Sequence, residues 1–212
     1  YDNKKDELIQ TLIKSGIRDS NVLEAFQKVK REKFVSPELK RLAYDNNALP
    51  ISNNQTISQP FTVAFMTQLL GVKNGSKILE IGTGSGYQAA ILCEMNAVVY
   101  SIERIEDLYV NSKRILSENH YKVHLKCSDG TLGWREHAPY DGIIVTAGSP
   151  DLPDSLVKQL KIGGKLVIPI GNKDSQEIWQ VIRVKDDDGK EYIDIFKHKN
   201  FKLVPLIGKE GW

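Results

Sequence analysis

The sequence has little cysteine, no long apolar run and almost no excess of charge of either sign. Its two cysteines, Cys93 and Cys127, lack a CxxC neighbour, which predicts buried thiols in a reducing compartment. No segment approaches the ~20 apolar residues of a membrane span, and no secretory signal pattern is visible at the N-terminus. We therefore expect a cytoplasmic protein.

The charges are nearly balanced, with 29 lysine and arginine residues against 27 aspartate and glutamate residues. No Lys/Arg block stands out, so we expect neither a nucleic-acid nor a membrane partner. The acidic run at 186–189 has the composition of a turn. At 212 residues and 41% hydrophobic side chains, the chain can bury the core of one domain.

Metal-ligating and acid–base patterns are also missing. The four histidines are scattered and no HExxH pair occurs, so we expect no metal site. Surface or structural roles are expected for His120, His124, His137 and His198.

The first part of the chain predicts helices. Apolar spacing indicates helices over 4–16 and 20–31, the second with Ser20 as its N-cap. The segment SPELKRLAY predicts a short third helix, with Ser36 as its cap and Pro37 in its first turn.

From Ser76 onward, short apolar strands alternate with helical segments, which is typical of a doubly wound, mostly parallel α/β sheet. The expected strands are 76–82, 97–103, 122–129, 140–148 and 163–171, and the expected helices are 87–95, 104–119 and 153–160. Two later segments, 177–185 and 191–200, flank a DDDGK turn and predict an antiparallel hairpin.

A glycine loop follows the first of these strands. LEIGTGSGY places Gly82, Gly84 and Gly86 between a strand and a helix, where a ligand can approach free backbone N–H groups. The dinucleotide fingerprint GxGxxG would need a third glycine where Tyr87 stands. The loop therefore favours a smaller nucleoside-like ligand and makes a nicotinamide oxidoreductase the weakest alternative.

Two acidic residues are predicted at the ends of the next strands. Glu103 lies about 20 residues beyond the loop, where a carboxylate can accept hydrogen bonds from ribose hydroxyls; an exposed strand-end glutamate is the alternative. Asp129 could accept from an adenine amino group, although an Asp-Gly turn explains this segment equally well. Together with the glycine loop, they predict an adenosine site, for which S-adenosylmethionine is the commonest ligand on this architecture.

The polar stretch NNQTISQP precedes an apolar helical pattern. Pro60 favours the first turn of a helix, so Ser58 or Gln59 is expected at the N-cap. Local physics favours capping as the role of Ser58. Binding of an anion is compatible with it, because a helix N-terminus attracts negative charge.

These motifs resemble those of the protein-L-isoaspartate O-methyltransferase family. The resemblance covers nearly the whole chain and is most specific in QTISQPFTVAFM (55–66), ILEIGTGSGYQAA (78–90) and LVPLIGKEGW (203–212). It implies a class I enzyme that transfers a methyl group from S-adenosylmethionine to the free α-carboxylate of L-isoaspartyl residues in damaged proteins and peptides, releasing S-adenosyl-L-homocysteine. The ester can then cyclise to a succinimide, whose hydrolysis restores some normal aspartate.

The resemblance also implies site residues. Ser58 takes the catalytic position. The implied substrate-binding residues are Thr56, Ile57, Gln59, Val204, Pro205 and Leu206. The implied cofactor-binding residues are Glu80, Ile81, Gly82, Thr83, Gly84, Ser85, Glu103, Ser128, Asp129, Gly130 and Thr146. Ile207 replaces a frequent threonine and Phe61 replaces a histidine of some members, so we expect no hydroxyl contact from the first and no polar role for the second.

We expect a single, monomeric methyltransferase domain with a Rossmann-like core, acting on isoaspartyl-containing proteins and peptides. Its expected parts are a helical N-terminal extension (1–52), a substrate and cofactor loop with its helix (53–75), a cofactor-binding α/β core (76–171), and a C-terminal hairpin with a substrate-closing tail (172–212).

The implied reaction requires no general base. A carboxylate with an unperturbed pKa of ~4 is already an anion at neutral pH, so the Ser58 hydroxyl only has to orient it. One alternative is another class I methyltransferase acting on a small molecule or RNA, although a basic stripe and a DPPY-like signature are both missing. The other is a cofactor-binding scaffold without activity.

Overall fold

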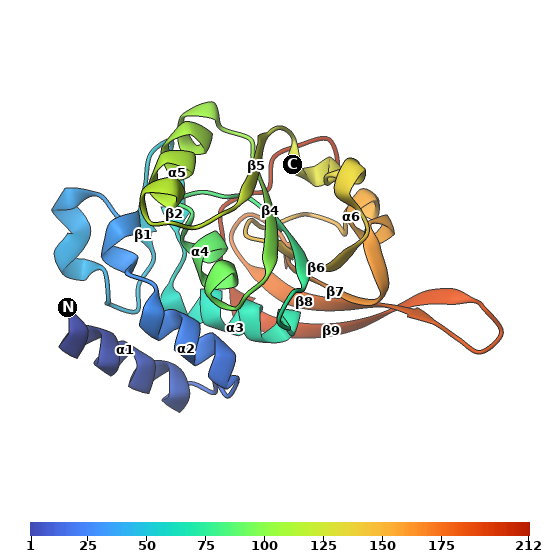
Figure 1. The fold of residues 1–212 in the computed structure, drawn as a ribbon. Coiled ribbons are helices and arrows are strands. Elements are labelled where there is room, and N and C mark those ends of the chain that lie inside the picture. Colours follow the sequence, from blue (N-terminus) through green and yellow to red (C-terminus); the bar gives the residue numbers. More distant parts are fainter.

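Seven strands form the central sheet of the protein. The computed structural model describes residues 1–212, with helices packed against this sheet (Figure 1). The strands are β3 (Lys77–Ile81), β4 (Val98–Glu103), β5 (His124–Cys127), β6 (Tyr140–Val145), β7 (Leu160–Gly171), β8 (Gln176–Lys185) and β9 (Glu191–Phe201). Their order, β5-β4-β3-β6-β7-β8-β9, confirms the predicted α/β class.

The remaining elements surround the sheet. The α-helices are α1 (Asp2–Lys14), α2 (Ser20–Lys28), α3 (Pro60–Leu70), α4 (Tyr87–Glu94), α5 (Glu106–Glu118) and α6 (Asp154–Lys158). Short 3₁₀ helices are η1 (Arg31–Phe34), η2 (Pro37–Leu42), η3 (Gly130–Leu132) and η4 (Arg135–His137), and β1 (Leu49–Pro50) pairs with β2 (Thr56–Ile57) in a separate ribbon. None of the helices has the length and apolar character needed to cross a membrane.

The sheet changes its direction of growth beside β3. The chain runs outward from β3 through β4 to β5 and returns to β6 on the other side of β3, all in parallel. In open α/β sheets, ligands bind outside the carboxyl ends of the strands at such a point. Beyond β7, β8 and β9 form the predicted antiparallel hairpin, which extends past the body of the protein (Figure 1).

Adjacent residues of the central strands belong to two different cores. Ile78 lies in a cluster of 31 buried residues shared with α1 to α4, whereas Leu79 lies in a cluster of 14 on the other face. Side chains alternate between faces along a strand, and here both faces are covered. This explains why the parallel strands are almost continuously apolar in the sequence.

Three local predictions need correction. Asp19, not Ser20, is the N-cap of α2, and its side chain accepts a hydrogen bond from the Asn21 N–H; a carboxylate one residue earlier satisfies the first turn equally well. The helix after Ser36 is of the 3₁₀ type. Cys127 is exposed rather than buried, because β5 is an edge strand of the sheet.

Candidate active site

The glycine loop joins β3 to α4 beside the point where the sheet changes direction. Gly82, Gly84 and Gly86 have φ angles of 95°, 55° and 94°, in the left-handed region that favours glycine. A Cβ atom on Gly82 would lie 2.7 Å from Thr146 Oγ1, which donates a hydrogen bond to the Gly82 carbonyl at 2.8 Å. Both the backbone conformation and the lack of space therefore require glycine at position 82.

Glu103 ties this loop to the end of β4. Its Oε1 accepts from the Gly84 N–H at 2.9 Å and its Oε2 from the Ile105 N–H at 2.8 Å. The side chain is only 5% exposed, so the alternative of an exposed strand-end glutamate is wrong. Each carboxylate oxygen can accept a further hydrogen bond, which leaves Glu103 able to bind a ligand.

Asp129 has a structural role, as the Asp-Gly turn interpretation predicted. Its Oδ1 accepts from the N–H and hydroxyl of Thr131, and its Oδ2 accepts from the Lys209 N–H at 2.8 Å. Partial burial by itself would raise the pKa of Asp129, but these hydrogen bonds hold the pKa below its usual value. Asp129 thereby fastens the C-terminal tail to the sheet. Ser128 is half-buried beside it.

Glu80 is a buried carboxyl group with an unused oxygen. Its Oε1 accepts from Ser101 Oγ at 2.6 Å, and this hydroxyl also contacts Thr83 Oγ1 at 2.6 Å, whereas Oε2 has no hydrogen-bond partner. Burial raises the pKa of Glu80 to about 8, and the charge of Glu103 adds to the increase. A buried polar atom without a partner is costly, and here it identifies a place for a donor or a cation from a ligand.

Three cavities share lining residues here; two of them lie at the carboxyl ends of the parallel strands, and the third lies between residues 47–62 and 199–203. The strand-end cavity, of about 70 Å³, is lined by Glu103 and Gly130 among others. The inner cavity, of about 40 Å³, is lined by Glu80 and Ser58 among others. The outer cavity, of about 460 Å³, is lined by Ser58 and Gln59 among others. All the predicted cofactor and substrate residues except Ser128 and Asp129 line at least one of these cavities.

The cavities meet at β2. Thr56 lines all three of them, and Ser58 lines the inner and outer cavities. Ile57, between them, is buried and lines the inner cavity. A ligand in the outer cavity and a ligand at the strand ends would therefore approach each other beside these hydroxyls.

The Ser58 hydroxyl is not used as a helix cap. Gln59 is the N-cap of α3, Pro60 occupies the first turn as predicted, and no side chain makes a cap hydrogen bond. The Gln59 side chain donates instead to the Asn46 carbonyl at 3.0 Å. The capping role for Ser58 is wrong, and its hydroxyl remains available to a ligand.

Arg31 lies behind Ser58 and was not predicted from the sequence. Its side chain is fully buried and donates to the carbonyls of Ala43 at 2.6 Å, Asn47 at 3.2 Å and Ser58 at 3.2 Å. It forms no ion pair, its Nε has no hydrogen-bond partner, and burial lowers its pKa. This guanidinium fixes the position of the segment that carries Ser58. No local pattern could have revealed it, because Arg31 and Ser58 are 27 residues apart.

The C-terminal tail covers the strand-end cavity. The Gly148 N–H donates to the Val204 carbonyl at 2.7 Å, and the Leu206 N–H donates to the Gly148 carbonyl at 2.8 Å. Val204, Pro205 and Leu206 line the strand-end cavity, whereas Leu203 lines the inner and outer cavities. Of residues 203–206, only Leu203 lines the outer cavity. A substrate-binding role for Val204, Pro205 and Leu206 stays a prediction.

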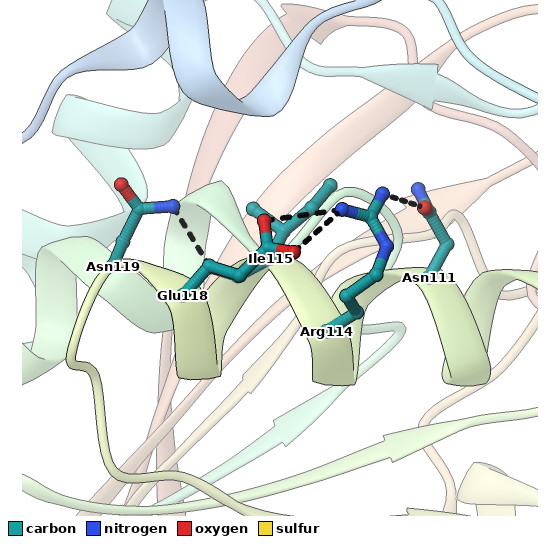
Figure 2. A network of polar contacts seen from close by, with 5 residues as sticks. All are labelled: Asn111, Arg114, Ile115, Glu118 and Asn119. Carbon is teal, nitrogen blue, oxygen red and sulfur yellow. Dashed lines mark hydrogen bonds and ion pairs between the residues drawn. The ribbon is translucent and has the colours of Figure 1, made fainter.

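The largest cavity, of about 750 Å³, lies between α5 and residues 33–40. Figure 2 shows its α5 wall, formed by Asn111, Arg114, Ile115, Glu118 and Asn119. There Arg114 donates to Glu118 at 3.1 Å and to Asn111 at 2.8 Å, so these polar groups satisfy one another (Figure 2). Of the predicted site residues, only two from the glycine loop reach this space. Size alone therefore does not identify the active site.

The carboxylate of Glu103 beside the glycine loop suits the ribose of an adenosine group. The inner cavity lies between this strand-end site and the outer cavity, since it shares Thr56 with both. Among doubly wound folds, this is the arrangement of a class I methyltransferase. The model of the protein-L-isoaspartate(D-aspartate) O-methyltransferase family matches residues 3–211. The chain belongs to that family, which confirms the resemblance seen in the motifs.

Individual relatives agree with this assignment. The chain is 46% identical to a protein-L-isoaspartate O-methyltransferase of Salinibacter ruber over 99% of its length and 94% of the relative. It is 49% identical to that of Chlorobaculum tepidum, covering 99% and 96%. It also resembles a Plasmodium falciparum structure assigned to the same enzyme and solved with S-adenosyl-L-homocysteine, with a TM-score of 0.77, 26% identity, and coverage of 95% and 97%.

Proposed function

We propose that this protein methylates the free α-carboxylate of L-isoaspartyl residues in damaged proteins and peptides, with Ser58 orienting that carboxylate. One observation carries the assignment of residues. Thr56 lines all three cavities and Ser58 lines two of them, so both hydroxyls stand where the acceptor and the cofactor would meet. The family to which the chain belongs supplies the reaction.

The strand-end and inner cavities fit the cofactor on two grounds. Glu80 Oε2 is buried without a partner, and no side chain would fit at Gly82. In this proposal Glu103 accepts from the ribose hydroxyls and Glu80 accepts from the cofactor's ammonium group. When bound, S-adenosylmethionine supplies a sulfonium methyl group that a carboxylate oxygen takes up, leaving S-adenosyl-L-homocysteine.

The residues around the acceptor orient it and transfer no proton. A carboxylate is already ionised at neutral pH, so the site needs no general base. Ser58 Oγ donates a hydrogen bond to the acceptor carboxylate, and the N-terminus of α3 adds a field that favours an anion. Because Arg31 fixes the Ser58 carbonyl, the hydroxyl is held in place before the acceptor arrives. Correct placement of reactants can lower a barrier by about 7–11 kcal/mol in well-oriented intramolecular cases.

A radiolabelled methyl-transfer assay tests the reaction. Two peptides are compared that differ only in an aspartyl or an isoaspartyl linkage, with cofactor binding measured separately by calorimetry. We expect base-labile label on the isoaspartyl peptide alone. Labelling of neither peptide by a protein that binds the cofactor would refute the proposed function.

A further inference from the structure

The outer cavity carries positive charge that the protein leaves unmatched. Lys199, near the end of β9, and Lys202, just beyond it, both line this cavity. Both side chains are exposed, and neither takes part in an ion pair. No aspartate or glutamate lines the cavity. Two lysines therefore border a concave space that has no carboxylate among its lining residues to compensate their charge.

Other cations in these regions are engaged. Lys197, on the same strand, lies 4.5 Å above the Trp179 ring. In the largest cavity, Arg114 is held by Glu118 and Asn111 (Figure 2). The free lysines of the outer cavity differ from both, so their charge remains available to a ligand.

The outer cavity also has an aromatic wall. Phe61 and Phe201 line it, and both stack on Phe65, with ring centroids 5.8 Å and 5.4 Å apart. This wall offers apolar contact but no countercharge. An occupant that satisfies the whole cavity is thus a polypeptide segment that combines apolar contact with negative charge.

The lysines are excluded from the place of methyl transfer. Neither of them lines the inner cavity, which Ser58 and Glu80 both line. A cation paired directly with the acceptor carboxylate would also lower its nucleophilicity. The charges of Lys199 and Lys202 therefore act on the residues beside the acceptor, and their effect falls on binding rather than on the chemical step.

We propose that Lys199 and Lys202 make the outer cavity selective for isoaspartyl segments that carry an acidic side chain next to the damaged residue. The proposal rests on the proposed function and assigns a substrate class to it. Unmatched charges of one sign in a concave site raise the local concentration of ligands of the opposite sign. Both lysines act over a Debye length of about 8 Å at physiological salt, a reach of two or three residues.

The test compares three isoaspartyl peptides that differ only in acidic, neutral or basic side chains at the flanking positions. At low ionic strength, where screening is weak, two charges at about 8 Å in an aqueous setting favour the acidic over the neutral peptide by about fivefold in kcat/KM. The difference lies in KM, and added salt reduces it. The double variant Lys199→Gln/Lys202→Gln loses the preference while keeping kcat on the neutral peptide.

The matched control is Lys185→Gln/Lys190→Gln, which removes two positive charges near the turn at the other end of β9. This variant keeps the preference of the unmodified protein. Equal kcat/KM for the three peptides in the unmodified protein would overturn the proposal, as would equal losses of the preference in both double variants. Methylation of the neutral isoaspartyl peptide without an acidic preference refutes the selectivity alone, whereas no methylation of any peptide refutes the function on which it rests.

Discussion

The two sides of the active site differ in how their polar groups are satisfied. At the strand ends, Glu103 and Asp129 are already bonded to backbone N–H groups. Around the outer cavity, Ser58 and the two lysines present side-chain groups that no protein partner engages. We call the strand ends the organised side, because their polar groups are already positioned for one ligand, the cofactor. We call the surroundings of the outer cavity the free side, because their polar groups remain available to acceptors of variable sequence. Glu80 Oε2 is the exception on the organised side.

The largest expected effect comes from substitution of Arg31, which holds the backbone of Ser58 on the free side. Arg31→Met leaves three carbonyls without their donor, and a buried group left unpaired costs about 1–3 kcal/mol. We expect the free energy of unfolding to fall by about 3 kcal/mol in urea denaturation, together with a loss of turnover. Arg31→Lys keeps the charge and should recover part of both.

Arg114→Met is the control for this loss. Arg114 and Glu118 are 57% and 59% exposed, and such pairs contribute about 0–1 kcal/mol. If both substitutions changed stability by the same amount, Arg31 would not be the support for Ser58 that its contacts indicate.

The second effect tests the organised side. Gly82→Ala places a methyl group against Thr146 in a left-handed conformation that costs about 1–2 kcal/mol before any clash. We expect cofactor affinity, measured by calorimetry, to fall at least about tenfold, which corresponds to about 1.4 kcal/mol. Gly75→Ala shares the strain, with φ at 82°, but meets no atom within 4 Å. It should lose some stability and keep its affinity; matching losses of affinity would argue against a cofactor role for the loop.

Ser58→Ala distinguishes an effect on the acceptor from an effect on cofactor binding. The hydroxyl makes no cap bond, so stability should change by less than about 0.5 kcal/mol. A hydrogen bond to a charged group contributes about 1.5–3 kcal/mol, so we expect kcat to fall about 10- to 100-fold while cofactor affinity stays the same. Ser36→Ala, at another N-cap without a side-chain bond, should leave kcat unchanged. Unaltered turnover in the Ser58 variant would remove the orienting role.

The organised side is also the side that the sequence predicts well. Gly82, Gly84 and Glu103 belong to a local strand–loop–helix unit whose spacing is visible in the chain, and the structure places them together. The alternation of strands and helices likewise predicts the parallel sheet, because each segment is regular in itself. Errors in other regular segments are small too, such as the shift of the α2 cap from Ser20 to Asp19.

The free side depends on contacts that no short segment contains. Arg31 approaches Ser58 across 27 residues. Lys199 and Lys202 reach the outer cavity because the end of β9 packs against α3, where Phe201 stacks on Phe65. Leu203, rather than the residues that follow it, borders the outer cavity because Val204 and Leu206 are bonded to Gly148. Long-range packing determines these positions, and the local periodicity of the sequence cannot predict such packing.

The smallest expected effect concerns Glu80 and the pH dependence of cofactor binding. Because burial raises the pKa of Glu80 to about 8 in the free protein, its carboxyl group is mostly protonated at pH 7. A ligand ammonium beside Oε2 favours the ionised form. Affinity for S-adenosyl-L-homocysteine should thus rise about tenfold between pH 7 and pH 9, and binding at pH 7 should release a proton. Calorimetry in buffers of different ionisation enthalpy measures both.

Glu80→Gln provides the control, because any titration of the ligand's own amino group remains while that of Glu80 disappears. The free protein supplies an independent check. Between the unfolded pKa of 4.5 and the folded pKa of about 8, the native state binds more protons than the unfolded state, so stability should decrease as pH rises through this range. The glutamine variant should lack this component. Equal pH profiles of affinity in both proteins would mean that Oε2 receives nothing from the ligand, and that the organised side contains a buried group serving only the fold.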